Sequence, residues 1–181
     1  MFEEIYNTIN LKKDEPSKFC GKESSIKMIS DIIATQNVKS VLDIGCGPTS
    51  IVRDICKELK KEYTGVDFND YEKKDIIKCD AHELSSLFKE NRFDLVVCSH
   101  ILEHAISPLL VLFEIKKVLT SGGTLFIECP PYTFGHTIYP WHIINLTEQQ
   151  IEHLLIISRF NVIYHNNYNE SRAEIFLARK I

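Results

Sequence analysis

Short apolar runs rich in β-branched residues alternate along this chain with stretches in which apolar residues recur every three or four positions. Each run is nearly continuous in apolar character, which is typical of parallel-sheet strands covered on both faces. The intervening stretches predict amphipathic helices. Strands that alternate with helices predict a doubly wound α/β sheet with right-handed crossovers. The five runs occupy residues 38–45, 62–67, 75–80, 93–99 and 123–129.

Local signals indicate where several helices begin and end. The helix after the first run is expected to hold Pro48 in its first turn and to continue to about residue 59. Another helix is expected to begin near Ser107, to pass through Leu119 and to stop at the glycines that follow.

The clearest helix start lies near residue 147. Thr147 and Gln150 have the spacing of a capping box, and Leu146 with Ile151 forms the hydrophobic staple around it. These signals predict a helix over about 147–158.

Two more apolar runs, at 160–165 and 173–179, flank a polar turn and predict an antiparallel hairpin at the sheet edge. The expected fold is therefore a mostly parallel sheet of about seven strands. Residues 1–37 hold two predicted helices, around 2–10 and 23–36. This N-terminal helical extension is too small for its own core, so we expect one domain whose main part is 38–181.

Composition excludes several classes of protein. The chain has 181 residues, 44% hydrophobic and 25% charged, which is ordinary for one globular domain. No apolar run approaches the ~20 residues of a membrane span, and the N-terminus lacks a signal-peptide pattern. We expect a cytoplasmic protein. A net charge of −4 gives no global attraction for nucleic acid.

The six cysteines are scattered and include no C-x-x-C pair. A disulfide framework or a zinc ribbon needs tighter clustering. Buried, reduced thiols are therefore expected, and no metal site is predicted.

The turn after the first strand indicates the ligand. In an open α/β sheet the ligand lies at the carboxyl ends of the strands, and Gly45 and Gly47 allow close backbone approach there. Ser50 replaces the third glycine of a dinucleotide fingerprint, which disfavours a pyrophosphate cradle. The carboxylate of Asp43 suits a ligand that carries an ammonium and a sulfonium. Asp67, about twenty residues after the turn, is placed to accept two ribose hydroxyls.

Four ordered segments carry a family resemblance: VLDIGCG, GVDFN with KCDAHEL, FDLVVCSHILEH, and LTSGGTLFIECP. With them the chain, from about residue 38 to 179, resembles the class I methyltransferases that depend on S-adenosylmethionine (SAM), in particular their small-molecule branch. The resemblance implies a Rossmann-like fold. It also implies transfer of a methyl group from SAM to an oxygen or nitrogen of a small-molecule acceptor.

The resemblance also implies a cofactor site. Asp67 would bind the ribose, Phe68 would lie against the adenine, and Asp80 with the Ala81 backbone would recognise the adenine edge. The backbone near Ser99 would border the methionine end. The full expected set is Asp43, Gly45, Cys46, Gly47, Asp67, Phe68, Asp80, Ala81, Ser99 and His100.

Several of these residues also have a purely structural interpretation. Asp43 would then cap the turn and Asp67 would be a surface acid. Asp80 would serve as an N-cap and Phe68 as a core residue.

Two tempting motifs are set aside. His100, Glu103 and His104 spell the H-x-x-E-H string of some zinc proteases, but that chemistry needs a long helix, and Pro108 follows closely. Cys129 begins a C-P-P-Y string similar to the N/D-P-P-Y motif of adenine methyltransferases. Its thiol cannot accept amino hydrogens as Asn or Asp would, so no nucleic-acid base is inferred.

The segment from 130 to 146 is long and aromatic, which favours contact with the acceptor over a loop that merely covers the sheet. If the acceptor is a hydroxyl, a base is needed. The candidate bases are His104, His136 and His142, and the candidate acceptor contacts are Tyr132, Phe134, Tyr139 and Trp141.

Two rival functions remain open at this point. One is a SAM-binding partner subunit without catalysis, and the other is an oxidoreductase that uses NAD on the same fold class. The missing third glycine and Asp43 count against the oxidoreductase.

Overall fold

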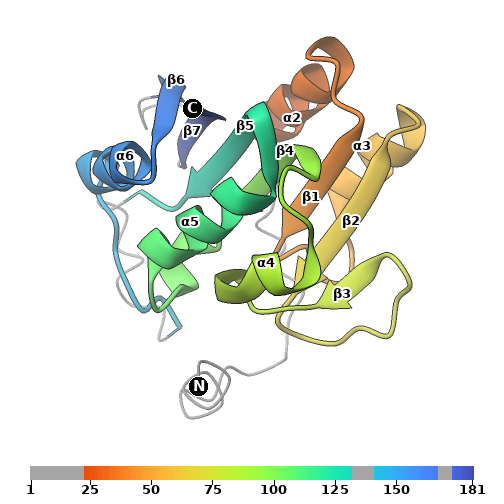
Figure 1. The fold of residues 1–181 in the computed structure, drawn as a ribbon, viewed down its shortest axis with the longest axis horizontal. Coiled ribbons are helices and arrows are strands. Elements are labelled where there is room, and N and C mark those ends of the chain that lie inside the picture. Colours follow the sequence, from red (N-terminus) through yellow and green to blue (C-terminus); the bar gives the residue numbers. More distant parts are fainter. Residues whose placement is uncertain (1–22, 132–140, 167–172) are drawn as a thin grey trace.

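The computed structural model of this chain describes residues 23–131, 141–166 and 173–181. Its centre is a seven-stranded sheet in the order β3-β2-β1-β4-β5-β7-β6 (Figure 1). The first five strands pair in parallel, and β7 pairs antiparallel with both β5 and β6. The strands are β1 (Ser40–Ile44), β2 (Glu62–Asp67), β3 (Ile76–Lys78), β4 (Phe93–Ser99), β5 (Leu119–Cys129), β6 (Phe160–Asn166) and β7 (Glu174–Lys180).

Helices cover both faces of the sheet. They are α2 (Glu23–Thr35), α3 (Ile51–Glu58), α4 (Leu84–Leu87), α5 (Pro108–Val118) and α6 (Glu148–Ile157), with 3-10 turns η1 (Ala81–Glu83) and η2 (Leu102–His104). One buried cluster joins the sheet to α4, α5 and α6, and a second joins it to α2 and α3. Figure 1 shows α5 crossing the face of the sheet opposite α3.

The predicted doubly wound sheet with its antiparallel hairpin is confirmed, and the strands at 62–67 and 93–99 have the predicted bounds. The capping box of α6 is also present. Thr147 Oγ1 accepts the N–H of Gln150 at 3.2 Å, and the Gln150 side chain accepts the N–H of Thr147 at 2.8 Å. The helix at 23–36 corresponds to α2, and the one expected near 2–10 lies outside the described residues.

The predicted start of α3 and the predicted end of α5 were wrong. Pro48 lies before α3 rather than in its first turn, because Ser50 is the N-cap and accepts the N–H of Arg53 at 3.1 Å. The helix α5 ends at Val118 and does not reach the glycines. Leu119 is extended (ψ 138°) and pairs with Phe93 as the first residue of β5.

The strand order places the ligand crevice. It reverses between β1 and β4, since β2 and β3 follow on one side of β1 and β5 on the other side of β4. Such a switch point opens a crevice at the carboxyl ends of the two central strands. The residues that follow Ile44 and Ser99 therefore form the floor of the candidate site.

The cysteines behave as predicted where the structure describes them. Cys46, Cys56, Cys79, Cys98 and Cys129 are all buried and free, and Cys20 lies outside the described residues. Burial raises the pKa of Cys46 and of Cys56 to about 12, which keeps both thiols protonated and unreactive. Within the described residues, no helix has both the length and the apolar character that a membrane crossing requires.

Candidate cofactor and acceptor site

The turn after β1 is built on two left-handed glycines. Gly45 has φ +70° and Gly47 has φ +60°, a conformation that glycine adopts without steric cost. A Cβ on Gly45 would lie 1.9 Å from Cδ1 of Ile101, whereas a Cβ on Gly47 would meet nothing within 4 Å. Gly45 thus lets the loop after β4 pack onto the turn, and open space adjoins Gly47.

Asp67, the last residue of β2, holds this turn. Its Oδ2 accepts the N–H of Gly47 at 2.9 Å, and its Oδ1 accepts the N–H of Asn69 at 2.9 Å. An ionised carboxylate has about four acceptor positions, so Asp67 can accept further donors besides these two N–H groups. Ribose hydroxyls are donors of this kind.

Asp43 is a buried carboxylate directly beneath the turn. It is 5% exposed, and its Oδ2 accepts the hydroxyl of Ser50 at 2.6 Å and that of Tyr63 at 3.2 Å. Burial raises its pKa to about 6, the negative charge of Asp67 adds to the shift, and the two hydroxyl donors oppose it. A cation bound near this carboxylate would offset the cost of its burial.

Gly65 makes room for these contacts and was missed by the sequence analysis. It pairs with Asp43 in the ladder between β1 and β2. A Cβ there would lie 2.7 Å from both Cys46 Sγ and Tyr63 Oη. A glycine inside a strand is the sequence signal that could have identified this close approach.

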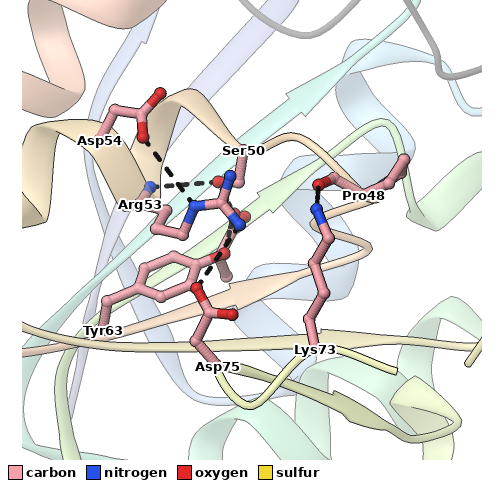
Figure 2. Close-up of polar contacts among 8 residues, drawn as sticks. Pro48, Ser50, Arg53, Asp54, Tyr63, Lys73 and Asp75 are labelled. Carbon is pink, nitrogen blue, oxygen red and sulfur yellow. Dashed lines mark hydrogen bonds and ion pairs between the residues drawn. The ribbon is translucent and has the colours of Figure 1, made fainter. Parts of the chain in front are cut away.

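The turn is braced from outside by two cationic side chains (Figure 2). Lys73 Nζ donates to the carbonyl of Pro48 at 2.5 Å. The guanidinium of Arg53 lies between Asp54 and Asp75, at 3.9 Å and 3.4 Å. These contacts fasten the segment after β1 to the segment that precedes β3.

Asp80 takes part in a three-residue chain of hydrogen bonds. Its Oδ1 accepts the N–H of His82 at 2.9 Å and lies 2.6 Å from His82 Nδ1. The N–H of Ser107 donates to His82 Nε2 at 3.2 Å, so Nδ1 must carry the proton and donate to Asp80. Burial acts to raise the pKa of Asp80, but the hydrogen bonds from His82 outweigh it and the net shift is downward. Asp80 is therefore a charged N-cap of η1, with Ala81 as the next residue.

A buried carboxylate that the sequence analysis missed fixes the end of β4. Glu128 is 2% exposed and accepts two hydroxyls at 2.8 Å, from Ser99 and from Ser25 of α2. Its backbone carbonyl accepts the N–H of His100 at 2.8 Å, and His100 has φ +54°. An acidic residue in an otherwise apolar strand was the available signal. The Ser99 hydroxyl is thus turned to Glu128.

The H-x-x-E-H string forms a 3-10 turn of three residues, η2, and no long helix. The structural objection to a zinc-protease site is confirmed. The carbonyl of Glu103 accepts the N–H groups of Ile143 and Ile144 at 2.9 and 3.1 Å. The segment that begins at residue 141 is thereby held against η2.

This contact brings together three residues that the sequence placed on the acceptor side. His104 Nδ1 lies 2.9 Å from the carbonyl oxygen of Trp141. The rings of His104 and His142 meet edge to face, with centroids 4.9 Å apart. The other predicted acceptor-side residues, Tyr132, Phe134, His136 and Tyr139, lie outside the described residues.

Comparisons with known proteins agree with this geometry. Residues 42–127 match the family described as a methyltransferase domain. An uncharacterized protein of Methanocaldococcus jannaschii is 34% identical over 90 residues, which is 48% of this chain and 39% of that protein. The chain thus spans well under two thirds of the length of that relative.

Solved structures share the fold at low identity. A SAM-dependent methyltransferase from Archaeoglobus fulgidus superposes with a TM-score of 0.67 at 19% identity, covering 97% of this chain and 99% of the other. The 1,6-didemethyltoxoflavin-N1-methyltransferase of Burkholderia thailandensis, solved with bound 1,6-didemethyltoxoflavin and S-adenosylhomocysteine, has a TM-score of 0.68 at 19% identity. That match covers 88% of this chain and 79% of the other.

Proposed function

We propose that the chain is a class I SAM-dependent methyltransferase and that it methylates an oxygen or nitrogen nucleophile of a small-molecule acceptor. The observation that carries the proposal is the pairing of Asp67 with the glycine turn, directly above buried Asp43. Two carboxylates at this edge of the sheet suit a nucleoside that also bears positive charge.

Each part of SAM has a proposed partner. Asp67 accepts the ribose hydroxyls, and half-buried Phe68 lies against the adenine. Asp80 and the backbone of Ala81 recognise the adenine edge. The methionine end runs past the turn at residues 45–47 toward the end of β4, where the backbone of Ser99 and His100 borders it. Asp43 supplies a negative potential beneath the cationic portion.

SAM supplies an activated methyl group on a sulfonium. The protein's main task is then to align the acceptor behind that carbon in a site with little water. His104, His142 and Trp141 meet at one place beside η2. We assign them to the acceptor side, with the two imidazoles as the polar groups that face the nucleophile.

One structural neighbour supports a small-molecule acceptor. The Burkholderia enzyme named above holds bound 1,6-didemethyltoxoflavin. That likeness is one of fold, so it supports the class of acceptor by analogy alone.

Two other functions are weighed against this one. An NAD-dependent oxidoreductase is disfavoured because Ser50 takes the place of the third glycine and its hydroxyl donates to Asp43. A SAM-binding partner subunit without catalysis would keep the carboxylates at the turn and lack methyl transfer.

Calorimetric titration with SAM, S-adenosylhomocysteine and NADH separates these functions. We expect both adenosyl ligands to bind with micromolar dissociation constants and NADH to give no heat of binding. Transfer of labelled methyl from SAM to a panel of small alcohols, phenols and amines then tests catalysis. NADH binding without SAM binding would overturn the proposal. SAM binding without transfer to any acceptor would support the partner subunit.

A further inference from the structure

We propose that Glu103, His104 and His142 together bind one divalent transition-metal ion, of the Zn²⁺ type, beside the methyl-transfer site. On the proposed function, this ion receives an oxygen of the acceptor. The sequence analysis predicted no metal, because it weighed only the spacing of the cysteines and the H-x-x-E-H string. The third ligand, His142, is distant in sequence and comes next to that string only in the fold.

The three side chains already lie at near-ligating distances. A carboxylate oxygen of Glu103 and one ring nitrogen from each histidine all lie within 4.8 Å of one another. Tetrahedral zinc with bonds of about 2.0–2.2 Å separates its ligand atoms by about 3.4 Å. The ligand atoms would therefore need to approach one another by at most about 1.4 Å, the difference between 4.8 Å and 3.4 Å.

Glu103 carries a buried oxygen that lacks a hydrogen bond. The residue is 2% exposed, and its Oε2 has no hydrogen-bond partner among the described residues. A buried acceptor without a partner is costly, and more so on a charged group. Its other oxygen, Oε1, lies 3.2 Å from His100 Nδ1 and 4.0 Å from His104 Nε2. A cation at Oε2 would satisfy the carboxylate from that side.

The orientation of His104 also suits a metal ligand. Its Nδ1 lies 2.9 Å from the Trp141 carbonyl, and a carbonyl can only accept, so Nδ1 donates and Nε2 is the lone-pair nitrogen of the neutral ring. Histidines that bind metals commonly donate the other ring N–H to a backbone carbonyl in this way, which fixes the ring.

A second cluster shows what the same residue types look like when they need no metal. His165 lies between Glu148 and Glu174, with Nδ1 at 3.2 Å from one carboxylate and Nε2 at 3.0 Å from the other. Its ring also stacks on Phe176 at 4.1 Å. Both carboxylates therefore already face a ring nitrogen. The cluster at Glu103 has the buried oxygen that this one lacks.

The ligand set indicates the ion and its use. Two imidazoles and one carboxylate are typical of Zn²⁺ and Fe²⁺ sites that keep a coordination position open, whereas Mg²⁺ and Ca²⁺ prefer oxygen ligands. Binding to the metal lowers the pKa of an acceptor hydroxyl at the open position. The hydroxyl can then give its proton to water at a pH at which the unbound hydroxyl would keep it. The oxygen lone pair then forms the bond to the methyl carbon, and the electrons of the broken C–S bond stay on sulfur.

The site is also close to the cofactor turn. Ile101, two residues before Glu103, packs against Gly45. An acceptor held by the ion would therefore lie on the side of the crevice toward which the methionine end of SAM is proposed to extend.

Titration of the full-length, chelator-treated protein with Zn²⁺ tests the inference directly. We expect one ion per chain with a dissociation constant at or below micromolar, and a loss of affinity of at least about tenfold in Glu103→Gln and in His142→Gln. His165→Gln is the matched control and should bind like the wild type. His142 is only half-buried, so its variant is expected to fold even if the Glu103 variant does not. An unchanged affinity in His142→Gln, or no stoichiometric ion in the wild type, would overturn the site.

The open position has its own test. Co²⁺ in place of Zn²⁺ gives visible absorption, and acetohydroxamate is a small oxygen ligand that should shift it. A spectrum that acetohydroxamate leaves unchanged would contradict the role in acceptor binding. SAM titration of the same samples keeps the two proposals separate, because loss of metal in Glu103→Gln should leave SAM affinity within about twofold. SAM binding without metal binding would contradict only the metal site. Metal binding without SAM binding would contradict only the proposed function.

Discussion

The carboxylate of Asp67 accepts the backbone N–H of Gly47 at 2.9 Å, so the end of β2 fixes the turn that follows β1. The same carboxylate is the proposed ribose ligand. Its position is therefore set before any ligand arrives, and the entropic cost of arranging the site is met during folding. This arrangement also makes the turn sensitive to any change at Asp67.

Replacement of Asp67 by alanine should abolish most of the SAM affinity. Two hydrogen bonds from ribose hydroxyls to a charged acceptor contribute about 1.5–3 kcal/mol each, so the dissociation constant should rise at least about a hundredfold. Calorimetric titration measures the change, and Glu58→Ala at an exposed position of α3 is the control. Wild-type affinity in Asp67→Ala would contradict the ribose assignment.

Replacement of Asp43 by asparagine should separate stability from binding. The amide oxygen still accepts from Ser50, while the cost of burying a charge disappears. The ligand-free variant should therefore be at least as stable as the wild type at pH 7 in urea denaturation, and it should bind SAM more weakly. A variant that is less stable and binds normally would show that Asp43 only supports the turn.

The raised pKa of Asp43 also predicts a pH dependence. As pH rises from about 4 to about 6, the unfolded carboxyl loses its proton while the folded one keeps it. The folded state then binds more protons, so this group lowers stability across that window by up to about 3 kcal/mol. Denaturation at several pH values should show the slope in the ligand-free wild type and a smaller one in Asp43→Asn. Equal slopes would refute the shift.

Two glycines in the left-handed region allow a controlled test of how the loop after β4 packs. Gly45 and Gly122 have φ +70° and +69°, but a Cβ on Gly122 meets nothing within 4 Å. Gly122→Ala should cost about 1 kcal/mol from backbone strain. Gly45→Ala should cost distinctly more, and the added Ile101→Val change should restore part of the loss. A double-mutant cycle on unfolding free energies measures the coupling, and zero coupling would rule out the contact as the cause.

Replacement of His82 should lower the free energy of unfolding more than replacement of a surface histidine. It donates to Asp80, accepts from the N–H of Ser107 and is 4% exposed. Replacement by alanine leaves these groups without their partner and opens a cavity, so the unfolding free energy should fall by about 2–4 kcal/mol. Exposed His153 on α6 is the control. Equal losses for His82→Ala and His153→Ala would show that the hydrogen-bond chain carries no stability.

The strands and the cofactor turn were predictable because their signals are local. A short apolar run, a glycine pair or a capping box each lies within about ten residues and has one dominant structural solution. The start of α3 and the end of α5 were not predicted correctly. Ser50 starts α3 through a side-chain cap, and Leu119 leaves the helix because it pairs with a distant strand. The local pattern of apolar and polar residues shows neither interaction.

On the acceptor side, even fewer contacts could be predicted from local sequence patterns. Nothing in the sequence near His142 indicates that it meets His104, since the contact depends on two backbone bonds to the Glu103 carbonyl. Glu128 and Ser25 likewise lie far apart in sequence and meet only through the sheet. Contacts between residues so far apart in sequence depend on the topology of the fold. Sequence motifs predict the fold class but not these individual contacts.

The position of β7 between β5 and β6 has a consequence for synthesis. β6 is made first, but its neighbour in the sheet follows it along the chain. Until β7 has joined the sheet, β5 keeps an unpaired edge and β6 has no strand to join. Exposed edges of this kind pair readily with other chains. Delayed pairing of β7 should therefore promote aggregation of newly made protein through the exposed edge of β5.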